Sequence, residues 1–588
     1  MSTDTARLQT ERNDGGTRWL VHGFDAARAR ALAGSLGTST LVAGLLIARG
    51  VGTEETARRL LRPTLEQLHD PAQMLGMREA VERVLRAIDA GERILIYGDY
   101  DVDGTTGTVV LRRALSLLGA RTGYHVPHRF TEGYGIRQDV LERAHAEGYR
   151  LVISVDCGIR AHEPLLWARE AGLDVIVTDH HLPDEDEGAP PAFAVLNPNQ
   201  KNCPYPDKNL AGVGVAFKLA HALFRARGRE GQVGGFLKVV AIGTVADVAQ
   251  LTGENRAIVA LGLADLPKAT NPGLRALMEV SGVGDGRDMQ ARDLGFRLGP
   301  RINAAGRMDA ARAVVELFET NSQQEAQRLA AHLDARNRER QSMQSLITAR
   351  ALAELELNRD CGERVAVIAG DGWHRGVIGL AASKIVELLH RPCIVISLDE
   401  DGIGHGSARS PDSYHLLEGL TACADLFEGF GGHAHAAGLA IRRENIPELR
   451  RRLNEHAASN IRADAFTPTL EIDAELPSHA LTLELCEELC ALEPFGAGWP
   501  RPVFLTRGFR VAGEPRVLKE RHLKIRVEDD EGRSFDALWW GGVAACAATP
   551  RAGQRIELAY GLETNTWRNE TRLQLVIEDM KSSLESGV

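Results

Sequence analysis

Short apolar runs alternate with amphipathic helical stretches between residues 76 and 250, and this alternation constrains the fold more than any other feature. When a strand, a helix and a further strand follow one another, the two strands usually lie parallel in one sheet. The runs that predict strands are residues 94–97, 122–126, 151–155, 174–178 and 192–196. The predicted fold class is therefore α/β, with a doubly wound parallel sheet in this part of the chain.

Side chains that can bind a metal follow three of these runs, and another ends the helical stretch 241–247. They are Asp99, Asp101, Asp103, Asp156, His180, His181 and Asp247. The carboxyl ends of parallel strands meet at one edge of a sheet, so these groups can converge there. Each alone has a plainer explanation, since an aspartate often caps a helix and a histidine often packs in a core. Together they predict a site for one or two Mn²⁺ or Mg²⁺ ions.

The chain has 588 residues, which is too many for a single hydrophobic core. The segment 1–75 shows a polar leader and helical patterns without visible chemistry, so we expect a cap or a partner surface. The expected division is an N-terminal extension at 1–75, a catalytic domain at 76–320, a connecting helix at 321–360, a second and smaller α/β domain at 361–462, and a β-barrel at 463–588.

Three glycine-containing segments, two of which also contain arginine, are expected to be loops. The segment 297–307 has the composition of an anion-facing loop, and 404–410 and 430–438 could bring backbone N–H groups close to a phosphate. A tight turn with a surface arginine is an equally good explanation for the last two. Between these segments, residues 322–356 predict one long helix whose charged run is a solvated face.

The last 120 or so residues contain five short strand patterns, which is typical of a small closed barrel of the oligonucleotide-binding type. Basic side chains gather near residues 519–526, and Trp539, Trp540 and Trp567 could stack on bases. Basic and aromatic groups on such a barrel favour single-stranded nucleic acid. We also expect at least one of these tryptophans to lie in the barrel core.

Composition bears on the kind of partner, the cellular location and the presence of an ATP-binding loop. The formal net charge of −11 argues against a generic nucleic-acid binder, although the local charge of a groove decides binding. The eight cysteines form no Cys-x-x-Cys pair, which suits a reducing cytosol. The N-terminus lacks a secretory signal pattern, so the expected location is the cytoplasm. No Gly-Lys dipeptide occurs, so a Walker-type ATP loop is not predicted.

Seven short motifs, in this order, carry a family resemblance that extends from about residue 76 to the C-terminus. They are residues 98–104, 154–158, 178–181, 243–247, 301–307, 406–410 and 431–433. The chain resembles the RecJ single-strand-specific 5′ exonucleases of the DHH phosphoesterase superfamily. The resemblance implies a DHH catalytic domain, a DHHA1 substrate-binding domain and an OB-fold domain.

The resemblance also implies roles for individual residues. Asp101, Asp103, Asp156, His180 and Asp247 would bind the metal, with Asp99 as a further ligand or a close neighbour. His181 would contact the scissile phosphate or bind metal from the edge of the site. The substrate-binding residues would be Arg129, Tyr134, Asn303, Arg307, Ser407, Arg409 and His433, with Ser407 and Arg409 on the terminal phosphate. Tyr97 stands where related pyrophosphatases carry a metal-binding histidine, which argues against a pyrophosphatase.

The expected activity is metal-dependent degradation of single-stranded DNA from the 5′ end to mononucleotides, in DNA recombination and repair. One alternative is a DHH-type phosphodiesterase that acts on short RNA or cyclic dinucleotides. Another is a non-catalytic scaffold with a degenerate site. The resemblance implies single-stranded DNA, a RecQ-type helicase and a single-strand-binding protein as partners. We expect a monomer without a membrane association.

Overall fold

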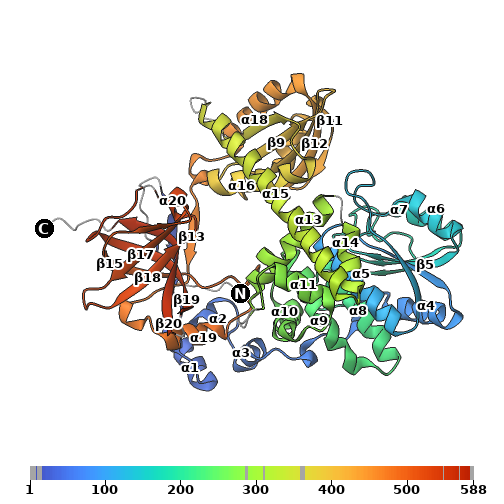
Figure 1. Ribbon diagram of the computed structural model, residues 1–588, viewed down its shortest axis with the longest axis horizontal. Coiled ribbons are helices and arrows are strands. Elements are labelled where there is room, and N and C mark those ends of the chain that lie inside the picture. Colours follow the sequence, from blue (N-terminus) through green and yellow to red (C-terminus); the bar gives the residue numbers. More distant parts are fainter. Residues whose placement is uncertain are drawn as a thin grey trace. The chain divides into compact units, whose positions relative to one another are not determined.

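The structure is a computed structural model that describes residues 8–9, 16–284, 289–308, 311–357, 364–546, 548–567 and 570–582. The chain divides into two compact units (Figure 1). One unit combines Met1–Pro63 with Thr467–Phe495 and Pro500–Val588, and the other combines Thr64–Phe466 with Gly496–Trp499. Each unit is described by itself.

The larger unit begins with a five-stranded sheet in which every neighbouring pair is parallel, in the order β4-β3-β5-β6-β7. The strands are β3 (Arg93–Tyr97), β4 (Arg121–His125), β5 (Tyr149–Val155), β6 (Asp174–Thr178) and β7 (Ala194–Leu196). The order reverses beside β3, so the sheet is doubly wound, as predicted. This reversal is the position where open α/β sheets bind ligands.

Helices cover both faces of this sheet because the strands alternate apolar side chains toward each face. Ile94, Ile96 and Ile153 pack against one set of helices, whereas Leu95 and Val152 pack against the other. The first set is α4 (Met77–Ala90), α5 (Val102–Leu117) and α8 (Gly212–Ala226), and the second is α6 (Gln138–Ala146) and α7 (His162–Glu170).

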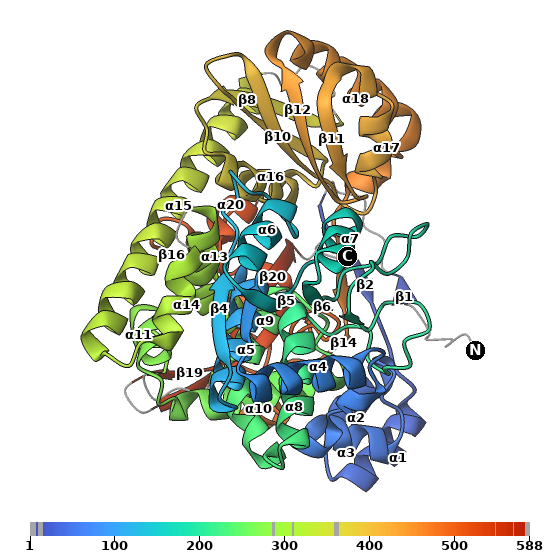
Figure 2. The same cartoon turned by 90° about the vertical axis from the view of Figure 1, so that its right-hand side faces the viewer.

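An all-helical segment follows and packs around a core of its own. Its helices are α9 (Leu237–Ala246), α10 (Gly253–Asp265), α11 (Pro272–Val280), α12 (Ala291–Asp293), α13 (Gly299–Arg307), α14 (Ala311–Glu319) and α15 (Gln323–Leu357). The long helix α15 leads from this segment to the second sheet (Figure 2), which agrees with the predicted connecting helix.

The loop predicted at 297–307 is wrong, because these residues are helical. A π-helical turn, Leu294–Leu298, runs directly into α13. Gly306 serves close packing, since a Cβ there would lie 2.1 Å from the carbonyl oxygen of Tyr100. Arg301 is structural as well, because its Nε donates to Asp334 at 2.9 Å.

The second sheet has the order β11-β12-β10-β9-β8, in which only β8 and β9 are parallel. Its strands are β8 (Ala366–Asp371), β9 (Cys393–Leu398), β10 (Ile403–Arg409), β11 (Phe427–Gly432) and β12 (Ala436–Arg442). The accompanying helices are α16 (Arg375–Leu389), α17 (Leu416–Thr421) and α18 (Ile446–Asn460).

The glycine-rich loops predicted in this domain are also wrong. Residues 404–409 lie within β10, and 430–438 form the ends of β11 and β12 with a short turn between them. The glycines permit tight packing on the sheet, because a Cβ on Gly404 or Gly406 would lie 2.6 Å from an atom of Ile396 or Leu439.

The smaller unit is built on a closed barrel. Five strands form a ring in the order β15-β19-β20-β18-β17, and a pairing of β15 with β17 closes it. The strands of this unit are β14 (Ala474–Glu475), β15 (Phe504–Val511), β16 (Arg516–Leu518), β17 (His522–Glu528), β18 (Ser534–Trp539), β19 (Arg555–Trp567) and β20 (Glu570–Ser582), with helices α19 (Leu483–Cys490) and α20 (Gly542–Ala545). This arrangement agrees with the predicted oligonucleotide-binding barrel.

The N-terminal segment packs against this barrel. Strand β2 (Arg18–Val21) pairs with β1 (Leu8–Gln9) and, in parallel, with β13 (Thr469–Ile472). The Nε1 of Trp19 donates to Asp579 at 2.7 Å, and the Nη2 of Arg49 donates to Asp473 at 3.0 Å. Three helices complete the segment, namely α1 (Ala26–Leu36), α2 (Thr40–Ala48) and α3 (Glu54–Leu61). Among the described residues no single helix could cross a membrane, although α1 and α2, bent by 113°, have the length and composition as a pair.

The tryptophans of the barrel divide between core and surface. Trp539 is 5% exposed, which confirms that at least one lies in the core, whereas Trp540 is 59% exposed. The side chain of Trp567 lies outside the described residues. Trp540 is therefore the tryptophan of this group that is available to stack on a base.

Candidate metal and nucleic-acid site

Seven side chains meet at the carboxyl edge of the parallel sheet. They form three overlapping groups, and within each group one possible ligand atom per residue lies within 4.8 Å of the others. The groups are Asp99 with Asp101 and Asp156, Asp103 with His180 and Asp247, and Asp156 with His180 and His181. The structure thus brings together all the residues that the sequence pointed to as metal ligands.

The loop after β3 is held by two helix N-termini. Asp101 caps α5, since its Oδ1 accepts from the backbone N–H of Gly104 at 2.9 Å. Asp103 accepts from the N–H groups of Gly212 and Val213, at 2.6 and 2.7 Å, where α8 begins. The positive ends of both helices favour the charged carboxylates. These bonds fix the two side chains and leave free lone pairs on their oxygens for a cation.

Asp156 stands at a strained position directly after β5. Its φ of 61° lies in the left-handed region, which non-glycine residues seldom adopt. Gly212 makes room for its carboxylate, because a Cβ there would lie 2.6 Å from Oδ1. Strained backbone of this kind persists where the surrounding structure enforces it, and it aims the buried carboxylate toward the two histidines.

Asp179 positions the histidine pair, a role that sequence reasoning missed. Its buried carboxylate accepts from the backbone N–H groups of Ile159, His180 and His181, at 3.0, 2.8 and 3.1 Å. It also bonds the Nδ1 of His181 at 2.7 Å. Burial opposes the charge of Asp179, but the hydrogen bonds from His181 and the backbone keep its pKa below the usual value. The sequence signal that could have indicated this role is the position of Asp179 directly before the two histidines.

Two asparagines that follow β7 hold the same loop from the other side. The Nδ2 of Asn197 donates to the carbonyl of His181 at 2.8 Å, and that of Asn199 donates to the carbonyl of His180 at 2.7 Å. These hydrogen bonds fix the backbone that carries the two histidine side chains. Nothing in the sequence distinguished them from ordinary turn residues.

The site gathers several buried carboxylates whose charged forms a bound cation would stabilise. Burial and the neighbouring carboxylates raise the pKa of Asp99 to about 8, that of Asp103 to about 7 and that of Asp247 to about 9. Burial also lowers the pKa of His180 to about 4, so this imidazole is neutral at pH 7. No described residue donates a hydrogen bond to the buried Oδ1 atom of Asp99 or of Asp156. Oxygen and neutral imidazole donors of this kind fit Mn²⁺ or Mg²⁺.

Tyr97 contributes nothing to this donor set. Its side chain is fully buried under the sheet, and its hydroxyl donates to the carbonyl of Gly135 at 3.0 Å. The hydroxyl also accepts from the N–H of Arg137 at 3.3 Å. Its role is to hold the loop before α6.

A group of four arginines lies next to the metal-binding edge. Arg129, Arg307, Arg340 and Arg409 come from four different elements and form no ion pair within the described residues. Burial and repulsion from the other three lower the pKa of Arg307 to about 9. Burial also lowers the pKa of Arg340 and, together with Arg129, that of Arg409. Clustered cations without acidic partners form a strong site for phosphate groups.

Sequence reasoning also missed the position of Arg340. It lies midway along α15, where the charged run was interpreted as a solvated face. Its Nη2 donates to Asn337 at 2.7 Å, and its Nε is buried without a hydrogen-bond partner. No local signal separates this arginine from the others on the helix.

Ser407 and Arg409, which were predicted to hold the terminal phosphate, lie beside the first turns of α16. The Nη1 of Arg409 donates to Ser407 at 3.1 Å, and both side chains lie against Gly379. The carbonyl of Gly376 accepts from Arg307 at 3.0 Å, and the ring of Phe130 meets that of His374 at 5.7 Å. The start of α16 therefore borders the end of α13 and the segment that follows β4.

Of the other four residues that were predicted to bind substrate, two lie at the metal-binding edge and two do not. Arg129 stacks on the ring of Tyr100 at 4.9 Å, and the hydroxyl of Tyr134 lies 3.2 Å from Nδ1 of His181. Both therefore stand at the metal-binding edge. Asn303 is half-buried on α13, and His433 is exposed in the turn between β11 and β12. No side-chain contact joins these two to the carboxylates in the described part of the chain.

Comparisons with known proteins agree with this geometry. The chain matches the DHH family, N-terminal domain, over residues 93–244, the DHHA1 domain over 362–459 and the RecJ OB domain over 472–579. It is 39% identical to the single-stranded-DNA-specific exonuclease RecJ of Bacillus subtilis, over 96% of this chain and 70% of that protein. It is 36% identical to the RecJ of Escherichia coli, over 92% and 95% of the two chains.

A solved structure gives the same result over the full architecture. The crystal structure of RecJ from Thermus thermophilus in complex with Mn²⁺ superimposes with a TM-score of 0.81 at 32% identity, over 98% of this chain and 81% of that one. With its three domains in the same order and its acidic edge intact, the chain belongs to the family of RecJ single-stranded-DNA-specific exonucleases.

Proposed function

We propose that this chain is a metal-dependent exonuclease that hydrolyses single-stranded DNA from its 5′ end to mononucleotides. The observation that carries the proposal is the meeting of three Asp/His groups with four arginines that have no acidic partner among the described residues. The carboxylates can hold cations, and the arginines can hold the phosphates of a strand across them. Related solved structures of RecJ contain Mn²⁺ or Mg²⁺.

The metal, when bound, supplies an acidic water and stabilises charge on the scissile phosphate. Asp101, Asp103, Asp156, His180 and Asp247 would hold it, with Asp99 beside them. Asp179 keeps His181 oriented at the edge of the site, where its ring can donate to a non-bridging phosphate oxygen. The hydroxyl of Tyr134 lies 3.2 Å from the same Nδ1 atom of His181.

Polarity would follow from the phosphate site on the DHHA1 domain. Ser407 and Arg409 form a polar pair beside the start of α16, and the positive end of that helix also favours an anion. A 5′-phosphate held there lies at a fixed separation from the metal, so the enzyme would remove one nucleotide at a time. Arg129, Arg307 and Arg340 would hold the intervening phosphates.

The wider biological assignments are proposals as well. The family matches at 93–244, 362–459 and 472–579 support a catalytic domain at 76–320, a connecting helix at 321–360, a DHHA1 domain at 361–462 and an OB domain at 463–588. We propose a monomer that acts in the cytoplasm on single-stranded DNA, in recombination and repair. A RecQ-type helicase and a single-strand-binding protein would be its partners.

The alternative phosphodiesterase for short RNA or cyclic dinucleotides is less favoured, because the chain carries the RecJ OB domain. The deciding experiment is digestion of a long 5′-phosphorylated single strand, compared with the same sequence as duplex and as RNA, in Mn²⁺ and in Mg²⁺. The proposal expects mononucleotides from the DNA single strand. Cleavage confined to dinucleotides would contradict it.

A further inference from the structure

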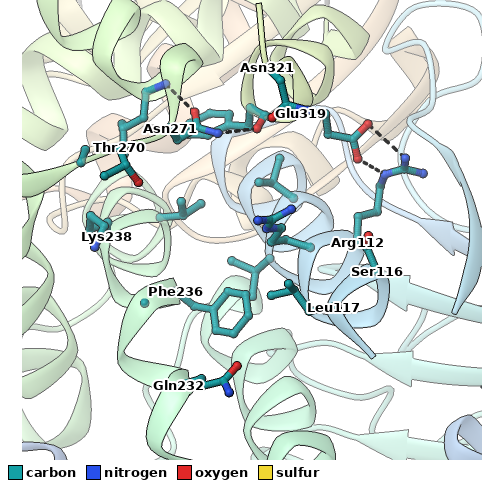
Figure 3. Close-up of a pocket in the computed structure, with 18 of the residues that line it drawn as sticks. Arg112, Ser116, Leu117, Gln232, Phe236, Lys238, Thr270, Asn271, Glu319 and Asn321 are labelled. Carbon is teal, nitrogen blue, oxygen red and sulfur yellow. Dashed lines mark hydrogen bonds and ion pairs between the residues drawn. The ribbon is translucent and has the colours of Figure 1, made fainter. Parts of the chain in front are cut away.

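A second site lies at the opposite ends of the two helices that carry metal ligands. Helix α5 has Asp103 in its first turn, and α9 ends at Asp247. The far ends of both helices line a cavity of about 840 Å³ (Figure 3). Arg113 is ten residues from Asp103 along α5, so about 15 Å separates the two positions along the helix axis. The cavity is therefore distinct from the metal-binding edge.

One part of the cavity wall is apolar. Phe236 and Leu117 lie together there (Figure 3), and Phe236 packs edge to face on Phe224 with the ring centroids 5.5 Å apart. Leu274 and Phe318 add further apolar surface. The volume falls within the roughly 300–1,000 Å³ of small-molecule sites, and such a wall suits an aromatic ring.

The polar part of the wall has cationic and hydroxyl groups that form no ion pair or hydrogen bond with the described residues. Arg112 is occupied by Glu319, and Lys238 by Asp265. Arg113 lines the same cavity and forms neither an ion pair nor a hydrogen bond with any residue that the structure describes. The structure also shows no hydrogen bond between any described residue and the side chains of Ser116, Thr270 and Asn321. This wall can therefore take up an anion with several hydrogen-bond acceptors.

We propose that this cavity binds a nucleoside monophosphate, with the base against Phe236 and the phosphate at Arg113. The choice of a nucleotide among aromatic anions rests on the proposed function, because a 5′-mononucleotide is the product that the enzyme would release. Two rigid helices connect the cavity to Asp103 and Asp247. Occupation of the site can thus report product concentration to the metal-binding edge.

Binding is tested by calorimetric titration of thymidine 5′-monophosphate in EDTA. The protein is the Asp156→Asn Arg409→Ala double variant, which lacks a proposed metal ligand and the proposed phosphate contact of the catalytic site. We expect one bound nucleotide per chain. Adding Arg113→Glu should weaken the binding at least about tenfold, since a charge-assisted hydrogen bond is lost. Arg86→Glu, an exposed arginine of α4, is the matched control and should leave the affinity unchanged.

Further measurements test which class of ligand binds and whether it binds in this cavity. Thymidine alone and inorganic phosphate alone should each bind more weakly than the monophosphate, and the nucleotide should slow amide exchange in residues 109–117. The absence of binding, or an affinity that Arg113→Glu changes less than about twofold, would overturn the site. Equal binding of phosphate alone would overturn the nucleotide assignment.

The proposed function is measured separately, by hydrolysis of single-stranded DNA with the otherwise unaltered Arg113→Glu protein. Normal hydrolysis by this protein, together with no nucleotide bound to the Asp156→Asn Arg409→Ala protein that retains Arg113, would refute this inference alone. Nucleotide binding that depends on Arg113 in a protein that never hydrolyses DNA would refute the proposed function alone.

Discussion

The Nε2 atom of His180 lies 3.2 Å from Oδ1 of Asp156, yet that buried oxygen accepts no hydrogen bond from the part of the chain that the structure describes. The imidazole is neutral at pH 7, because burial lowers its pKa to about 4. Nearby, Nε2 is 3.8 Å from Asp103 and 3.9 Å from Asp247. A nitrogen lone pair surrounded by three carboxylates is an arrangement that a divalent cation stabilises.

Divalent cation should therefore stabilise the larger unit against heat. A ligand that binds only the folded state at one hundred times its Kd adds about 2.7 kcal/mol of stability. We expect Mn²⁺ to raise the melting temperature of this unit by several degrees over the value in EDTA, measured by calorimetry. Potassium chloride of equal ionic strength is the control. Equal melting temperatures in Mn²⁺ and EDTA would argue against a cation site.

Arg409→Ala should reduce the preference for 5′-phosphorylated ends. The guanidinium stands beside Ser407 and forms no ion pair in the described structure, so its charge is available to the terminal phosphate. A lost charge-assisted contact corresponds to about a tenfold or larger fall in the ratio of rates on phosphorylated and hydroxyl ends. Arg391→Ala, on an exposed arginine beyond α16, is the comparison. An unchanged ratio in Arg409→Ala would remove this residue from the phosphate site.

Trp540→Ala should weaken the binding of long single strands. The side chain is 59% exposed on the barrel, and its ring meets that of His522 at 4.8 Å. Stacking of a base on an aromatic side chain contributes about 1–3 kcal/mol. Fluorescence anisotropy with a long oligonucleotide should show a Kd raised at least about fivefold, whereas Val543→Ala should have little effect. A Kd unaffected by Trp540→Ala would place the strand elsewhere on the barrel.

Lys218→Met should strongly destabilise the larger unit. Lys218 is fully buried on α8, forms an ion pair with Glu254 and donates to the carbonyl of His69 at 2.8 Å. Removing one partner of a buried pair leaves the other charge uncompensated, at a cost of about 3–5 kcal/mol. Denaturant unfolding measures this loss, and the exposed Lys201→Met should stay within about 0.5 kcal/mol. A similarly small loss in Lys218→Met would contradict the role of this pair.

The parallel sheet and the edge that carries its predicted metal ligands could be predicted from local sequence. The spacing of apolar residues identifies the strands, and the residues that follow each strand identify the edge. Apolar runs of strand length mark the sheet, and strand C-termini share an edge whatever the packing details. The sequence alone therefore predicted the proximity of Asp101, Asp103, Asp156 and His180. The strand ends moved by at most two residues, as for β5, which was predicted at 151–155 and spans Tyr149–Val155.

The segments that were not predicted depend on contacts distant in sequence. Glycine at 404, 406 and 306 signals a turn as readily as close packing, and the neighbour that decides lies elsewhere in the chain. Arg340 acquires its role only because α15 passes beside Arg307. The pairing of β2 with β13 joins residues some 450 positions apart, for which no local pattern exists.

The most direct test of the metal-dependent exonuclease is Asp156→Asn, assayed on 5′-phosphorylated single-stranded DNA in Mn²⁺. The change removes a buried carboxylate that touches two of the three ligand groups, so hydrolysis should fall by more than about a hundredfold. DNA binding in EDTA and thermal stability should be retained, because the arginines are untouched and a repelling charge is gone. Hydrolysis at the normal rate in this variant would contradict the account.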